Sequence, residues 1–242
     1  MHNNLIDIVI PLGSGSRYNN LELRMALRSI ACYAVNVNDI YIVTAELPDW
    51  VKNVKTIEKR DTYLHNKDAN IIEKLLAAAA LPELSETFLF WSDDQLALHR
   101  FDAAHLPITC NPRQYKDFNQ STVWHQRMRN TFEYLQKHNI FLSCNFDTHL
   151  PMPLEKAAFT RIMNNAKYSA EPGYCVNTLY CGMLGMTGAL EQQRIKHTAE
   201  SRETLTALPQ DKLFLGYNDC AMQNGLPELL LDYFPEKCKY ER

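Results

Sequence analysis

Several patterns that identify common classes of protein are missing from this chain of 242 residues. Its seven cysteines are scattered, none forms a CxxC pair, and an odd number cannot all be joined in disulfides. Free thiols are typical of a reducing compartment. The N-terminal residues lack the regions of a secretory signal, and no stretch approaches the ~18 apolar residues that span a bilayer. We therefore expect no integral membrane segment and a cytoplasmic protein, which could act at the inner face of the membrane.

Basic charge and glycine-rich nucleotide motifs are missing as well. The net charge is -3, whereas a general nucleic-acid binder needs an excess of Lys and Arg to displace counterions. The segment Gly13-Ser-Gly-Ser16 follows an apolar run, but it matches neither GxGxxG nor the P-loop. The sequence thus excludes the standard dinucleotide and Walker-type sites and predicts no nucleic-acid partner. Local basic groups can still hold a phosphate.

What the chain does contain is typical of one α/β domain. Hydrophobic residues make up 46% and charged residues 22%, and the length suits a single unit over 1–242. Apolar runs alternate with segments of helical period, which indicates parallel strands joined by right-handed crossovers. We expect irregular excursions at 100–123 and 191–210. The pattern predicts strands over 5–12, 39–44, 54–58, 88–91 and 140–146, and helices over 21–30, 69–81, 124–137, 154–164 and up to Tyr233.

The central feature is an apolar run that stops at two carboxylates. Phe88 to Trp91 is unbroken, as expected of a strand buried on both faces, and Asp93 and Asp94 follow it directly. Open α/β sheets bind ligands at the carboxyl ends of their strands. Two unit charges ~4 Å apart repel by ~4 kcal/mol at an effective dielectric of about 20, so a cation would relieve them. The simpler alternative is a solvated loop; the flanking strand favours a divalent-metal site.

Other polar groups follow predicted strands in the same way. His149 comes after the run at 140–146, and its neutral-range pKa suits a general base, although a lone histidine is more often structural. Gly13 and Ser14 lie between a strand and a helix, where amides can cradle an anion, although turn formation is the commoner role. Asn218 and Asp219 offer oxygen ligands beside a glycine. Six other histidines are interpreted as structural, namely His65, His99, His105, His125, His138 and His197.

Four separate stretches resemble, in order, the signature blocks of the Stealth proteins, which are sugar-phosphate transferases. The family's second block is similar to Asn20 to Ala34, followed by Asp39 to Thr44 and Pro48-Asp-Trp50, and then to Leu81 to Asp94. Thr148-His-Leu-Pro-Met-Pro-Leu-Glu-Lys156 resembles the third block, which is built around His-x-Pro. Tyr217-Asn-Asp219 and Phe234-Pro-Glu-Lys-Cys-Lys-Tyr-Glu241 resemble the fourth. In the place of the first block, which usually carries a Trp-Val-Asp-Gly-Ser-Asp sequence, this chain has Pro11-Leu-Gly-Ser-Gly-Ser16.

This resemblance implies a GT-A-like three-layer α/β/α sandwich with a mostly parallel central sheet. It also implies a nucleotide-sugar donor, a glycan or polysaccharide acceptor, and Mg²⁺ or Mn²⁺. Asp93 and Asp94 match the metal-binding pair, with Asp94 the first choice because Ser92 stands where a DxD motif begins. The matched catalytic residues are His149, Asp94 and Asp219. The matched substrate-binding residues are Arg24, Arg28 and Asn218, and Gly13 and Ser14 join them as the predicted anion cradle between a strand and a helix.

Three functions stay open at this point. The first is metal-dependent transfer of a sugar-1-phosphate to a glycan hydroxyl in cell-surface polysaccharide synthesis. The second is a GT-A glycosyltransferase reaction that transfers only the sugar, which the missing first-block aspartate keeps open. The third is a non-catalytic nucleotide-sugar-binding domain. Two carboxylates suffice for Mg²⁺, which takes its other ligands from phosphates and water.

Overall fold

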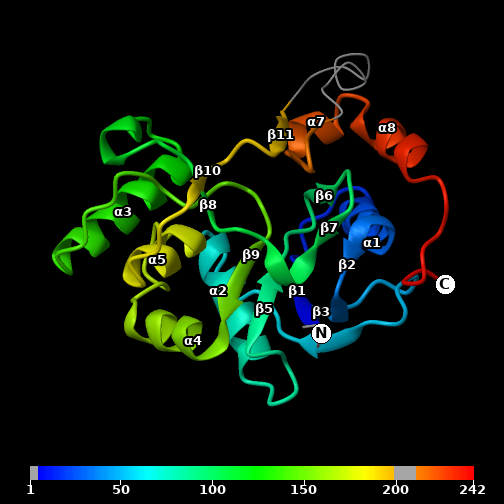
Figure 1. Ribbon diagram of the computed structural model, residues 1–242, viewed down its shortest axis with the longest axis horizontal. Coiled ribbons are helices and arrows are strands. Elements are labelled where there is room, and N and C mark those ends of the chain that lie inside the picture. The colour runs from blue at the N-terminus through cyan, green and yellow to red at the C-terminus, as the bar shows by residue number, and fades with distance from the viewer. Residues whose placement is uncertain (1–4, 199–210) are drawn as a thin grey trace.

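A five-stranded sheet forms the centre of the protein, as a computed structural model describes it over residues 5–198 and 211–242 (Figure 1). Four strands are parallel, and the fifth, at one edge, is antiparallel to its neighbour. The prediction of an α/β protein with a mostly parallel central sheet is confirmed. In spatial order the strands are β4 (Lys55–Glu58), β3 (Val37–Thr44), β1 (Ile6–Pro11), β5 (Thr87–Phe90) and β9 (Met152–Glu155).

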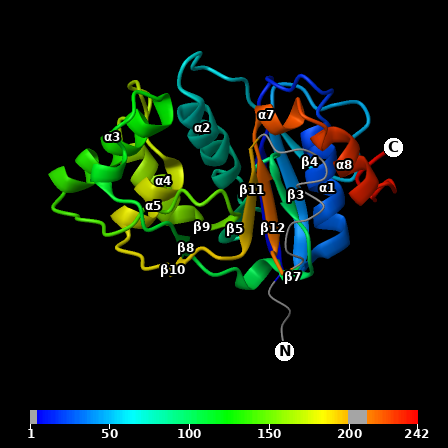
Figure 2. The same cartoon turned by 90° about the horizontal axis from the view of Figure 1, so that it is seen from above.

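Helices cover both faces of this sheet, because the strand side chains alternate between two apolar clusters (Figure 2). In β1, Ile8 and Ile10 pack towards one face and Val9 towards the other, all with 0% exposure. The first face carries α1 (Leu21–Tyr33) and α8 (Leu226–Tyr233). The second face carries α2 (Lys67–Ala79), α4 (Lys156–Asn165) and α5 (Val176–Met183).

Two of these helices begin at the carboxyl edge of the sheet, since each follows a parallel strand. In α2 the side chain of Asn66 accepts a hydrogen bond from the Ala69 amide, as expected of the N-cap. Further along α2, the buried Lys74 donates to the Leu12 carbonyl at 2.7 Å and to Asp61 at 2.6 Å. This lysine therefore fixes the end of β1, where the candidate site begins, onto the α2 face.

Three smaller sheets surround the centre, and each takes one strand from the predicted excursions. Within 100–123 the chain forms β7 (Phe101–Asp102), η1 (Ala103–His105), β8 (Thr109–Cys110) and η2 (Tyr115–Asp117). Within 191–210, residues 194–197 form a strand where we expected irregular structure, and 199–210 lie outside the described residues. The sheets are β2 (Ala34–Val35) with β7, β8 with β10 (Ala189–Leu190), and β11 (Arg194–His197) with β12 (Phe214–Tyr217) and β6 (Gln95–Ala97).

One predicted strand is wrong, and one predicted helix is confirmed with a later start. The apolar run at 140–146 is not a strand. Its residue Asn145 forms an isolated bridge with Asn111, next to β8, and its residue Phe141 is 76% exposed. The helix predicted from residue 154 begins only at Lys156, because β9 occupies Met152–Glu155. Glu155 ends this strand and caps α4, accepting hydrogen bonds from the amides of Ala157 and Ala158. The proline-rich run before α4 therefore supplies the edge strand of the sheet.

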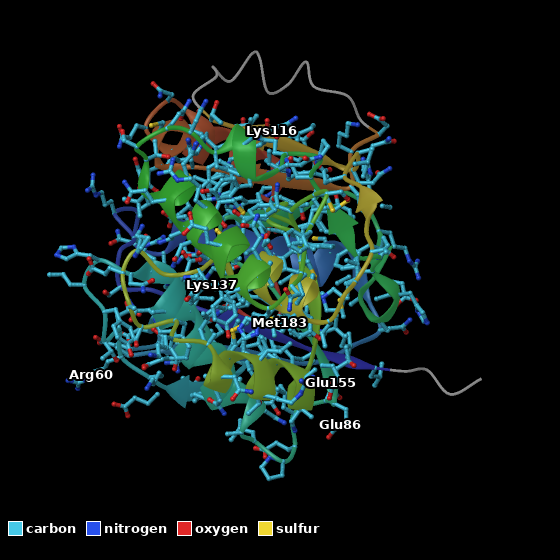
Figure 3. The ribbon with its side chains drawn as sticks, turned by 90° about the vertical axis from the view of Figure 1, so that its left-hand side faces the viewer. Arg60, Glu86, Lys116, Lys137, Glu155 and Met183 are labelled. Atoms are coloured by element: carbon cyan, nitrogen blue, oxygen red, sulfur yellow. The ribbon has the colours of Figure 1, made fainter. Side chains whose placement is uncertain are left out.

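A further helix, α3 (Val123–Lys137), stands beside the second face and packs on α5. Figure 3 looks onto this side, with Lys137 at the end of α3 and Met183 at the end of α5. Glu86 and Glu155 mark the amino edge of the sheet at the bottom of that view, and Lys116 of η2 lies at the opposite end. No helix within 5–198 or 211–242 is long and apolar enough to cross a membrane.

Candidate functional site

The two carboxylates that follow β5 lie in a tight turn at the carboxyl edge of the sheet. Trp91 is fully buried, and its indole N–H donates to the carbonyl of Gln95 at 2.8 Å. The Gln95 side chain accepts in turn from the Ser92 amide at 3.2 Å. These bonds close the chain around Asp93 and Asp94, which are both half-buried. The turn therefore holds two adjacent carboxylates at the end of the central strand, where a ligand can reach them.

Burial and mutual repulsion disfavour the charged forms of this pair. Burial, and then the carboxylate of Glu22 in the first turn of α1, raise the pKa of Asp93 to about 6, while Lys67 of α2 opposes the rise. Burial, and then the charge of Asp93, raise the pKa of Asp94 to about 7. Backbone hydrogen bonds lower both pKa values without offsetting these effects. The pair thus carries negative charge that the surrounding protein only partly neutralises.

Strand β12 lies directly against this turn. The Tyr217 amide donates to the carbonyl of Asp94 at 3.4 Å, and the Tyr217 hydroxyl donates to the carbonyl of Asp93 at 3.5 Å. Burial, followed by the charges of Asp94 and Asp93, raises the pKa of Tyr217 well above its ordinary value. The phenol therefore stays protonated at neutral pH and acts as a hydrogen-bond donor.

Lys196 on β11 brings a positive charge to the same place. The residue is exposed to solvent, yet partial burial of its charge and then the neighbouring Arg194 lower its pKa. The carboxylates of Asp147 and Asp94 oppose that effect, and Lys196 in turn lowers the pKa of Asp94. Lys196 therefore lies within electrostatic range of the pair and can neutralise an anion bound there.

His149 reaches the same edge because β9 runs antiparallel to β5. The register pairs Phe90 with Met152, so the residues before β9 lie at the carboxyl end of β5. A Cβ added to Gly216 of β12 would lie 3.9 Å from the Cβ of His149, which places the histidine against that strand. Burial lowers the pKa of His149, while Asp147 raises it and Lys196 and Arg194 lower it. At neutral pH the imidazole is therefore uncharged and able to accept a proton.

The remaining predicted residues fall into two groups. Gly13 and Ser14 are exposed just beyond the end of β1, the strand that pairs with β5. Asp219 is exposed in the first turn of α7 (Asp219–Met222), and its charge raises the pKa of Asp94. The Asn218 side chain accepts from the Ala221 amide at 3.0 Å, so its oxygen caps α7. These residues border the carboxylate pair.

Arg24 and Arg28 of α1 point elsewhere. Arg28 is buried, donates to both carboxylate oxygens of Glu241 at 2.6 and 2.8 Å, and contacts the carbonyl of Phe234. Arg24 lies 3.5 Å from the same Glu241 carboxylate and stacks on Trp50 at 4.5 Å. A diphosphate could bind Arg28 only if this buried ion pair were broken. Both arginines hold the C-terminal segment onto α1.

Five residues at the site were missed by the sequence reasoning, for physical reasons. Lys196 lies in a polar stretch that we interpreted as a loop, and Asp147 in one that we assigned to a strand end. Glu22 and Lys67 stand in the first turns of helices, where a charged residue is usually solvated. Only Tyr217 carried a signal, since it directly precedes the Asn-Asp pair that the resemblance had marked.

The donor set limits how a metal could be held. Among residues 5–198 and 211–242, no group of three or more His, Cys, Asp or Glu side chains is placed to hold an ion. The carboxylates of Asp93 and Asp94 could supply two ligands, so the site suits an ion whose other ligands are phosphates and water. No protein-family model matches the chain, and no curated protein is significantly similar to it.

Proposed function

We propose that the chain is a divalent-cation-dependent nucleotide-sugar transferase with a GT-A-like fold. In this proposal it passes a sugar-1-phosphate from a nucleotide-sugar to a glycan hydroxyl in cell-surface polysaccharide synthesis. The observation that carries the proposal is the Asp93–Asp94 pair at the carboxyl end of the central strand, with raised pKa values, beside Lys196 and a neutral His149. Phosphoryl transfer needs this combination of charge neutralisation, positioning and a base for the hydroxyl.

Mg²⁺ or Mn²⁺ fits the two carboxylates, because Mg²⁺ characteristically binds one or two carboxylates together with substrate phosphates. When bound, the ion would neutralise charge on the diphosphate oxygens. The chain's own residues have distinct parts. Asp94 and Asp93 would hold the ion, Lys196 would pair with a phosphate oxygen, and the Tyr217 hydroxyl keeps the turn in place.

The proton of the acceptor hydroxyl passes to a ring nitrogen of His149. The acceptor oxygen forms a bond to the β-phosphorus as the bond from that phosphorus to the bridging oxygen breaks. A nucleoside monophosphate leaves with the bridging oxygen, and the sugar-1-phosphate stays on the glycan. His149 can take this proton because burial keeps its pKa below the ordinary value and the ring uncharged.

A second candidate keeps the fold and the cation but transfers only the sugar, which releases a nucleoside diphosphate. The segment at the end of β1 favours it, because Gly13 and Ser14 stand where the resembling family has an aspartate. A non-catalytic nucleotide-sugar-binding domain is the third candidate.

The released nucleotide distinguishes these candidates. The protein is incubated with nucleotide-sugars, Mg²⁺ or Mn²⁺ and glycan acceptors, and the nucleotide product is identified by chromatography. A monophosphate supports the proposal, a diphosphate supports sugar transfer, and no turnover of any donor supports a binding domain.

His149→Ala tests the proposed base. Turnover should fall by ~10²–10⁴-fold with donor binding retained, the range typical of a lost general base. His99→Ala is the matched control, because His99 is an exposed histidine outside the site and should keep full activity. Full activity of the His149 variant would assign that residue a structural part.

A further inference from the structure

Trp124 is an exposed aromatic residue held at the border of the candidate site. It lies in the first turn of α3 and is 37% exposed. Its indole N–H donates to a carboxylate oxygen of Asp147 at 2.5 Å. Exposed tryptophans without a partner rotate freely, whereas this one has its N–H edge fixed to a residue two positions before His149.

The body of the indole is fixed as well. The Arg113 guanidinium carbon lies 5.1 Å from the Trp124 ring centroid and 4.6 Å from that of Phe118. Phe118 is fully buried and meets Trp124 edge to face, with centroids 5.4 Å apart and planes at 83°. These contacts, together with the ring of His125 at 5.2 Å between centroids, hold the indole in place, and more than a third of the residue stays exposed. Binding to it requires little loss of side-chain freedom.

Asp147 connects this surface to the reacting groups. Its carboxylate acts on the pKa values of both His149 and Lys196, so all three lie within electrostatic range of one another. The intervening Thr148 is fully buried and meets Thr109 of β8, with hydroxyl oxygens 3.1 Å apart. The segment from Asp147 to His149, which carries both the partner of the indole and the proposed base, is thus held in place.

We propose that the exposed face of Trp124, with the Asp147 carboxylate beside it, binds a pyranose ring of the glycan acceptor next to His149. This inference rests on the proposed function. The C–H face of a pyranose packs on an aromatic ring, and its hydroxyls donate to a carboxylate. The donor is a poorer occupant, because its diphosphate would be repelled by Asp147 and is accounted for by the Asp93–Asp94 pair and Lys196.

Direct binding can be measured without knowing the donor. The chain has three tryptophans, and each gives one indole N–H signal in a ¹⁵N-correlated NMR spectrum. A panel of hexose and N-acetylhexosamine oligosaccharides is titrated into the protein, with Trp124→Phe used to assign the signal. We expect the Trp124 signal to move while those of Trp50 and Trp91 stay in place. An unmoved Trp124 signal, or equal movement of all three, would overturn the subsite.

Kinetics separate the subsite from the proposed function. Release of nucleotide by the wild type from nucleotide-sugars and glycan acceptors tests the transferase proposal, and its absence would overturn that proposal while the NMR result still decides the subsite. With turnover present, Trp124→Ala should raise the acceptor KM about tenfold, equivalent to about 1.4 kcal/mol, and the donor KM by less than about twofold. Phe141→Ala, which removes another exposed aromatic, should leave both unchanged. A rise confined to the donor KM would overturn the acceptor assignment.

Discussion

Replacing Asp94 by asparagine should make the metal-free protein more stable at neutral pH. The ordinary pKa of 3.8 rises to about 7 in the folded protein, chiefly through burial and then through Asp93. The folded state therefore holds a proton that the unfolded chain has lost, and the free energy of unfolding falls as the pH rises from about 3.8 to about 7. At ~1.4 kcal/mol per unit of pKa, the upper bound of this loss is about 4 kcal/mol.

The expected effect is smaller, because Asp94 is half-buried and shares its repulsion with Asp93. Allowing for solvent screening, we expect Asp94→Asn to gain about 1–2 kcal/mol at about pH 7.5. For a chain of this length each kcal/mol shifts the unfolding midpoint by about 2–4 °C, so the midpoint should rise by about 2–8 °C. At about pH 5 the gain should shrink, since Asp94 in the folded wild type is then protonated and, like asparagine, uncharged.

The assay is thermal unfolding followed by circular dichroism at both pH values, with excess chelator or with Mg²⁺. In the wild type Mg²⁺ should raise the midpoint at neutral pH, because binding to the folded state alone stabilises it. The Asp94→Asn midpoint should not respond. Asp102→Asn serves as the control, since hydrogen bonds from Asn36 and then His105 lower the pKa of Asp102, the opposite direction. Loss of stability in the Asp94 variant, or an undiminished response to Mg²⁺, would refute the reasoning about this pair.

Two further predictions concern the support of the fold. Glu241→Gln leaves the Arg28 guanidinium buried without its counter-charge, since the side chains are only 7% and 3% exposed, and should cost about 3–5 kcal/mol in urea unfolding. The double variant Arg28→Met with Glu241→Leu should recover most of that loss, and no recovery would contradict this view of the pair. Gly173 has φ at 89°, and a Cβ there would lie 2.9 Å from the side-chain Cγ of Asn66, the residue whose side-chain oxygen caps α2. Gly173→Ala should therefore lose about 2–3 kcal/mol through backbone strain and the disturbed cap, while Gly15→Ala, with open space around it, should lose little.

The periodic parts of the sequence determine most of the central fold. The apolar runs of β1, β3 and β5 and the helical faces of α1, α2 and α3 appear where the pattern places them. The failures come from tertiary context. The run at 140–146 has the composition of a strand, but it forms irregular structure that meets the end of β8 through the isolated bridge between Asn145 and Asn111. Pro153 in β9, and Pro151 just before it, hide a strand that lies at the edge of the sheet, where proline is tolerated.

The candidate site could be predicted in part, for a related reason. Residues at the carboxyl ends of strands, such as Asp93 and Asp94, can be predicted because the apolar run of a buried strand stops just before them. His149 was placed correctly at this edge, but on a mistaken strand, since it precedes β9 and follows no strand at 140–146. Lys196 and Glu22 reach the site through strand pairing and helix docking that no local pattern reveals. Arg28 was predicted to bind substrate, but it forms a buried ion pair with Glu241, a partner too distant in the sequence to be foreseen.

His149 has a left-handed backbone conformation, with φ at 52°, so keeping a side chain at this position lowers the stability of the folded protein. A non-glycine residue in this region gives up about 1–2 kcal/mol, and glycine gives up none. A His149→Gly protein, which lacks the proposed base, should therefore unfold at a higher temperature than the wild type, whereas His149→Ala keeps the backbone strain. For selection acting on folding alone, glycine would be the favoured residue here. A search for stabilised variants of this protein would then drift toward losing its proposed base.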